Sequence, residues 1–284
     1  IFDKQIPERM GLNESFWPET LSEYWPKQGY PEGADPAEVF SYDVRGVGGW
    51  FDSTPFRGVW DVLEETDEWR VARDGRGAAL KFWKHKSGTP EHVDFLMTSR
   101  AVWERDYRPH LLAFDRERLG DLDAVRRNLA EARAAGVWAH YGHLFVWEGM
   151  RQAMGDVTLY ESLLTDPGWI HDYCRVYTDF HQRNYAYLIE HGGKPDGVWM
   201  YEDLGYSNGL FASPDVLREL IFPYFKEMVD FFHGYDLPVV LHSCGSTAAA
   251  LPLIVAAGFD ALNPMERKAK DNDPFVFAEQ YGDK

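Results

Sequence analysis

Cysteine is scarce in this sequence of 284 residues, with Cys174 and Cys244 as its only two. Two thiols cannot form the disulfide framework of a small secreted domain, and a reducing cytoplasm is the expected location. Long apolar runs are also missing, because charged residues interrupt the hydrophobic segments, and we expect no contact with a membrane. The first residues do not have the pattern of a signal peptide.

Basic residues are few compared with acidic ones. The 29 Lys and Arg residues face 46 Asp and Glu residues, and the formal net charge is -17. Such a charge repels phosphate backbones, so we expect no nucleic acid among the partners. Glycine-rich phosphate loops and nucleophile elbows are absent too, which leaves kinase and serine hydrolase functions without support. Hydrophobic residues make up 45% of the chain, which is enough for a sizeable buried core.

The first hundred residues predict a cap and an antiparallel sheet. Aromatic residues, glycine and proline are scattered through residues 1–50, which predicts loops and short helices. Residues 57–98 predict a β-meander, because short β-prone segments alternate with the turns Asp74–Gly77 and Ser87–Pro90. We assign residues 1–100 as the cap and meander of a single domain that spans residues 1–284.

From residue 101 onward the sequence predicts βα units. Helices are expected at Asp123–Ala135, after Asp166-Pro167 and after Ser213-Pro214, the last with a kink at Pro223. Alternation of strands and helices predicts an α/β fold with a parallel sheet, and we favour a TIM (β/α)8-type barrel. Only four strands are clear in this part, so we expect the barrel to be incomplete at the C-terminus. These strands are Val137–Gly142, Gly197–Tyr201, Pro238–Leu241 and Phe259–Asn263.

Polar residues directly follow these strands, where active residues of a barrel lie. His242 and Cys244 are two positions apart, so on an extended segment their side chains project to the same side. An imidazole and a thiolate that converge are two of the ligands that zinc prefers. Glu266 follows the next strand and can supply a carboxylate as a third metal ligand.

Each of these residues has a structural interpretation as well. The His-x-Cys pair is equally consistent with a core cysteine beside a hydrogen-bonded histidine. Glu202 and Asp203 are adjacent, so only one of them faces the mouth of the barrel, and helix capping or a salt bridge would also explain them. His143 shares this ambiguity.

The segments Pro238–Gly245 and Gly258–Pro264 resemble the uroporphyrinogen decarboxylase superfamily, and most closely its methyltransferase-like branch, which acts with corrinoid proteins. The resemblance extends over nearly the whole chain and implies a TIM barrel. That branch is similar to cobalamin-independent methionine synthase at its zinc site, where a His-x-Cys pair is followed by a Glu and a more distant Cys. His242, Cys244 and Glu266 match the first three positions, but no cysteine follows Cys244 in this sequence.

The resemblance implies zinc-dependent transfer of a methyl group, from a methylcorrinoid on a partner protein to a small-molecule thiol. Glu202, Asp203 and His143 are the candidate catalytic residues. Two alternatives stay open. One is decarboxylation of a porphyrinogen, although the Arg-rich motif that binds the substrate carboxylates in uroporphyrinogen decarboxylases has no match near the start of the chain. The other is a non-catalytic barrel that binds a ligand or a corrinoid protein.

Overall fold

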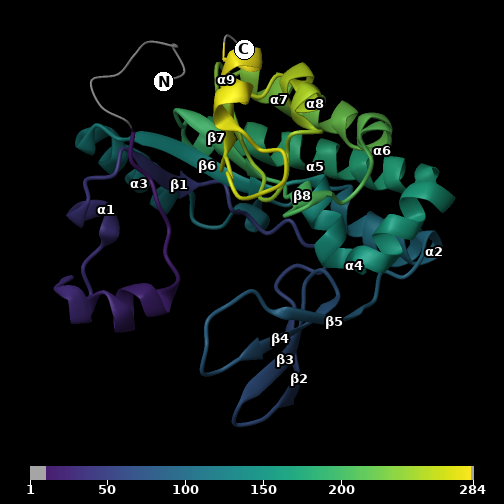
Figure 1. Ribbon diagram of the computed structural model, residues 1–284. Coiled ribbons are helices and arrows are strands. Elements are labelled where there is room, and N and C mark those ends of the chain that lie inside the picture. The colour runs from purple at the N-terminus through teal and green to yellow at the C-terminus, as the bar shows by residue number, and fades with distance from the viewer. Residues whose placement is uncertain (1–10, 283–284) are drawn as a thin grey trace.

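A parallel sheet forms the centre of the molecule in the computed structural model, which describes residues 11–282 (Figure 1). The five strands lie in the order β1-β6-β7-β10-β11, which is also their order along the chain. The predicted α/β class with a parallel sheet is therefore confirmed. The described residues form an open sheet with β1 and β11 at its edges, and they do not close a barrel. The strands are β1 Val44–Gly48, β6 Trp138–Leu144, β7 Gly197–Tyr201, β10 Val239–His242 and β11 Ala261–Asn263.

The helices between these strands begin where the sequence predicts. The Asp166 carboxylate accepts the backbone N–H of Trp169 at the start of α5, and Ser213 caps α6 in the same way. The helix expected to kink at Pro223 is divided into α6 and α7 at Ile221, because proline has no N–H to continue the helical bonding. The helices of this part are α3 Leu122–Ala135, α4 Val146–Thr165, α5 Pro167–Gly192, α6 Pro214–Leu220, α7 Phe222–His233, α8 Leu251–Ala257 and α9 Pro274–Tyr281.

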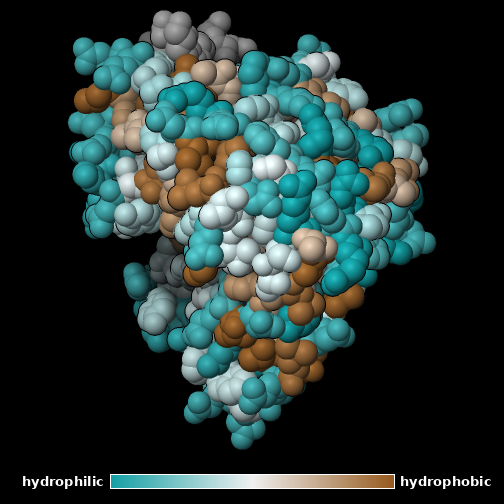
Figure 2. Space-filling view, turned by 90° about the vertical axis from the view of Figure 1, so that its right-hand side faces the viewer, coloured by the Kyte–Doolittle hydropathy of each residue, from teal (hydrophilic) through white to brown (hydrophobic). Residues whose placement is uncertain are grey.

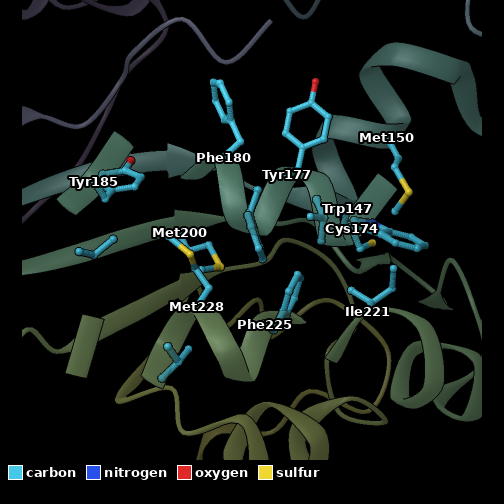
Figure 3. Packing of buried hydrophobic residues seen from close by; sticks show 14 of the residues in the cluster. Trp147, Met150, Cys174, Tyr177, Phe180, Tyr185, Met200, Ile221, Phe225 and Met228 are labelled. Carbon is cyan, nitrogen blue, oxygen red and sulfur yellow. The ribbon is translucent and has the colours of Figure 1, made fainter. Parts of the chain in front are cut away.

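The main core lies between one face of the parallel sheet and the helices α5 and α7. Figure 3 shows Met200 of β7 with Met228 and Phe225 of α7 below it and Tyr185 of α5 above it. All four side chains are completely buried. Neighbouring residues of a strand face opposite sides of the sheet. On the face away from this core, Trp199 of β7 and Val240 of β10 line a cavity of about 370 Å³. The two faces of the sheet therefore have different roles.

The meander forms a separate antiparallel sheet that projects from the main body (Figure 1). It docks on α4 where the ring of Phe95 meets Gly155. Gly155 has a φ of 73°, and a Cβ there would lie 2.5 Å from that ring, so only glycine allows this approach. Figure 2 shows hydrophobic residues towards the lower end of the molecule, at the height of the meander. In the meander, Trp60 and Val62 are exposed. Its strands are β2 Trp60–Glu65, β3 Trp69–Asp74, β4 Ala78–Trp83 and β5 Glu91–Phe95.

The N-terminal region corrects one expectation. Short helices are present, but Val44–Gly48 is strand β1, which pairs in parallel with β6. Two of its five residues are glycines, so the segment has little local strand signal, and its pairing joins residues far apart in the sequence. Residues 1–10, also expected to form part of the cap, lie outside the described residues. The remaining elements are η1 Thr20–Tyr24, η2 Pro26–Gln28, α1 Pro36–Val39, α2 Arg100–Val102, η3 Trp103–Tyr107, η4 Arg108–Leu111, η5 Arg116–Leu119, β8 Gly205–Tyr206 and β9 Gly209–Leu210.

Candidate metal centre

Three potential metal ligands meet at the carboxyl ends of neighbouring strands. His242 is the last residue of β10, Cys244 follows it by two positions, and Asp203 lies two positions beyond the end of β7. Because β7 and β10 are paired in parallel, their carboxyl ends lie at the same edge of the sheet. One ligand atom from each of the three side chains lies within 4.8 Å of the other two.

The distances fit a compact donor set. The Cys244 Sγ is 3.4 Å from the His242 Nε2, and that nitrogen is 3.8 Å from the Asp203 Oδ1. The His242 Nδ1 is 2.9 Å from the Oδ1 of Asn263, at the end of β11. Because an amide oxygen only accepts, this contact assigns the proton to Nδ1 and leaves the Nε2 lone pair facing Cys244. A second neighbour of this kind commonly orients a metal-bound histidine.

Backbone contacts fix the two loops that carry these side chains. The Asp203 Oδ1 accepts the backbone N–H of Cys244 at 2.8 Å, and the Ser243 Oγ accepts the N–H of Leu204 at 3.0 Å. Gly245 has a φ of 78°, and a Cβ there would lie 2.6 Å from the backbone of Gly205. The close approach of the two loops therefore requires glycine at position 245.

The charges around Cys244 are unfavourable for a thiolate. Burial, the Asp203 carboxylate and the nearby Glu266 carboxylate together raise the pKa of the Cys244 thiol to about 12. Without a cation the thiol is therefore protonated at neutral pH. A divalent cation would offset the clustered negative charge, and one nitrogen, one sulfur and a carboxylate oxygen form a donor set typical of zinc.

Glu266, predicted as the third ligand, lies beside Cys244. It belongs to the loop after β11, and its carboxylate is close enough to hydrogen-bond with the thiol. It is not one of the three residues whose ligand atoms all lie within 4.8 Å of one another, and Asp203 is. The structure thus brings both carboxylates to Cys244, with Asp203 in the more compact arrangement.

Glu202 points away from this cluster. Its carboxylate is fully buried and accepts the backbone N–H groups of Phe145 at 2.5 Å and Trp147 at 2.7 Å, where α4 begins. Burial is the largest cause that raises the pKa of Glu202, the Glu148 carboxylate adds to it, and the N–H donors act in the opposite direction. Glu202 and Asp203 therefore point in opposite directions, as their adjacency predicts.

His143 lies in surroundings that differ from those of the cluster. It lies on the helix side of β6, with its ring centroid 5.0 Å from that of His181 and 4.9 Å from that of Tyr185. Neither ring nitrogen has a hydrogen-bond partner. Burial and the neighbouring His181 hold the pKa of His143 well below its usual value, so its imidazole is neutral. The catalytic roles predicted for His143 and Glu202 stay predictions.

Sequence reasoning gave no role to Asn263 and placed Asp203 among catalytic groups rather than ligands. Both follow or end strands, so their positions at the mouth were visible in the sequence. The contacts that define them, from Asn263 to His242 and from Asp203 to Cys244, join residues 21 and 41 positions apart. No local pattern signals such pairings.

The residues of this cluster lie in a segment that matches a known protein family. Residues 147–271 match the uroporphyrinogen decarboxylase (URO-D) family, and this range contains Asp203, His242, Cys244 and Glu266. The resemblance predicted from the sequence is therefore confirmed for the segment that holds the candidate metal centre.

Among solved structures, a methyltransferase from Methanosarcina mazei is similar with a TM-score of 0.46 and 13% sequence identity. The aligned region covers 66% of this chain and 52% of that chain, so this chain spans about half of the methyltransferase. No curated protein matches the chain. Within residues 11–282, no helix combines the length and apolar character needed to cross a membrane.

Proposed function

We propose that this chain belongs to the methyltransferase-like branch of the URO-D superfamily and transfers a methyl group from a methylcorrinoid, carried by a partner protein, to a small-molecule thiol. The observation that supports this most strongly is the cluster of Asp203, His242 and Cys244 at one edge of the parallel sheet. Its position agrees with the rule that α/β enzymes bind substrates at the carboxyl ends of their strands. The five parallel strands would form part of a TIM-type barrel.

In this proposal His242, Cys244 and Asp203 hold a zinc ion. Bound zinc would supply a Lewis acid that lowers the pKa of a substrate thiol. Asn263 positions the His242 ring, and the N–H of Cys244 positions the Asp203 carboxylate. The His242 and Asp203 side chains are 25% and 37% exposed, which leaves room for a substrate to reach the cluster.

Glu266 is then placed to accept a proton. Its carboxylate lies beside the Cys244 thiol and outside the compact set of three ligands. During the reaction the substrate thiol loses its proton, a bond forms between its sulfur and the methyl carbon, and the bond between that carbon and the corrinoid cobalt breaks. The electron pair of the broken bond stays on the corrinoid.

The activity can be tested with methylcobalamin as donor and a panel of small thiols as acceptors. We expect thioether formation by the zinc-loaded protein, loss of at least about 100-fold of the rate in Cys244→Ser, and little change in Cys174→Ser. Cys174 is the other cysteine, buried in α5, and serves as the matched control for loss of a thiol. A metal-free protein that keeps its full activity after His242→Ala would contradict the proposal.

A further inference from the structure

A cleft between the meander and the N-terminal segment is separate from the candidate metal centre. It is lined by Trp17 and Pro18 on one side, by β4 residues that include Lys81 and Trp83 on the other, and by the turn Lys86–Pro90 with the following Glu91. Its volume is about 460 Å³, and none of the metal-centre residues lines it. A cavity of this size suits a small organic molecule rather than a single ion.

Two lysines converge on one ring in this cleft. The Lys81 Nζ lies 4.4 Å from the centroid of the Trp83 ring, and the Lys86 Nζ lies 4.7 Å from the same ring. Both ammonium groups therefore lie against the same indole, so two cations border one part of the cleft. Within the described part of the chain neither forms an ion pair, whereas the intervening Lys84 pairs with Glu65 at 2.8 Å. In a chain with a net charge of -17, this is a local concentration of positive charge.

The acidic groups nearest to the cleft are already engaged. Glu91 accepts the indole N–H of Trp83 at 2.9 Å, which fixes the ring that the lysines approach. Glu19 accepts the backbone N–H of Ser87 and so connects the N-terminal segment to the turn of the meander. Trp17 is 59% exposed and offers an aromatic surface on the opposite wall. The cleft thus combines the indole of Trp83, which Glu91 holds, and the exposed indole of Trp17 with two cations that form no ion pair within the described residues.

We propose that this cleft binds a small aromatic carboxylate. The ring of the ligand would pack between Trp17 and the apolar parts of β4, and its carboxylate would lie near the ammonium groups of Lys81 and Lys86. An anion in that position is attracted by both lysines, and the aromatic walls exclude water from the ring. A neutral or a cationic aromatic molecule lacks this favourable interaction with Lys81 and Lys86.

The test uses 2-naphthoate as the probe, with isothermal titration calorimetry on the whole chain. The neutral 2-naphthylmethanol and the cationic 2-naphthylmethylammonium serve as comparison ligands. We expect 2-naphthoate to bind with a Kd of roughly 1 mM or tighter, as the ligand's size allows. Lys81→Gln and Lys86→Gln should each raise that Kd about threefold to fivefold, and added salt should raise it as well. Lys84→Gln is the matched control and should leave the Kd unchanged, because this lysine does not line the cleft.

Fluorine NMR of protein labelled with 5-fluorotryptophan locates the binding. The Trp17 and Trp83 signals, assigned with Trp17→Leu and Trp83→Phe, should shift on addition of 2-naphthoate. Three results would overturn the proposal: no binding of 2-naphthoate, equal binding of the neutral or cationic ligand, or an unchanged Kd in the folded double variant Lys81→Gln/Lys86→Gln. Shifts confined to other tryptophans would also contradict it, since they place the ligand elsewhere.

Discussion

His242 and His143 occupy similar positions on two strands that flank β7, yet they lie in opposite surroundings. His242 ends β10 on the face with the cavity, is partly exposed, and has partners for both ring nitrogens. His143, near the end of β6, faces the helices, is 2% exposed, and has no partner for either nitrogen. A histidine at a strand end therefore becomes a candidate ligand only when its side chain points to the correct face and a neighbour orients it.

The largest effect expected from this comparison concerns metal affinity. His242→Ala should weaken zinc binding by at least about 100-fold, because it removes one of three converging ligands. His143→Phe should leave zinc binding within about twofold of the unmodified protein. Competition with a chromophoric chelator measures both affinities, and equal losses in the two variants would remove the distinction between the two faces.

Acid stability tests the burial of His143 and its neighbour His181. Burial lowers the pKa of His181 to about 3, and burial together with His181 lowers that of His143. Unfolded histidines bind protons near pH 6.5, so the unfolded state gains protons first as the pH falls. The free energy of unfolding should therefore be highest above about pH 6.5 and fall by up to about 1.4 kcal/mol per pH unit for each buried histidine, down to about pH 3 for His181.

Urea denaturation at pH 7, 6 and 5 measures this slope. His143→Phe should flatten it, and replacement of the exposed His85 by glutamine should not. A slope that does not change in the folded His143→Phe protein would show that this histidine is protonated in the native state, against its burial.

Glu202 and Asp203 extend the comparison to two adjacent carboxylates. Glu202→Gln should lower the free energy of unfolding by about 1–3 kcal/mol, because an amide NH2 replaces one of the two carboxylate oxygens that accept buried backbone N–H groups at the start of α4. Its zinc affinity should stay within about threefold of the unmodified protein. Asp203→Asn should have the reverse pattern, with weakened zinc binding and little loss of stability. Denaturation and chelator competition on the same samples separate the two outcomes.

The smallest effect is expected at Asn263. Asn263→Ala should weaken zinc binding about tenfold, because the His242 ring loses the group that orients it. Asn263→Asp should restore the affinity, since a carboxylate also accepts the Nδ1 proton. If Asn263→Ala binds zinc normally, packing alone orients His242.

Much of this structure was predictable from local patterns. The bounds of β7 were predicted correctly, and helix caps such as Asp166 marked the start of α5, because these signals lie within a few residues. Alternation along a strand was sufficient to bring His242 and Cys244 together. Strand β1 was not predicted, because its glycine-rich sequence pairs with β6 about 90 residues away.

The place of Asp203 in the cluster could not be predicted for a related reason. Side-chain direction beyond a strand depends on the following turn, here fixed by Gly245 and by the bond from the Cys244 N–H to Asp203. The sequence indicated that either Glu202 or Asp203 faces the mouth but could not show which. The hydrogen bonds of the two carboxylates show that Asp203 faces the mouth, because Glu202 accepts from the N-terminal backbone of α4 and Asp203 accepts from the Cys244 N–H.

X-ray absorption at the zinc edge of the zinc-loaded protein shows directly whether Cys244 binds the metal. We expect one sulfur ligand at about 2.3 Å together with nitrogen and oxygen ligands at about 2.0–2.2 Å, and loss of the sulfur shell in Cys244→Ser but not in Cys174→Ser. A zinc ion surrounded only by nitrogen and oxygen, or a protein that retains no zinc after gel filtration, would contradict it.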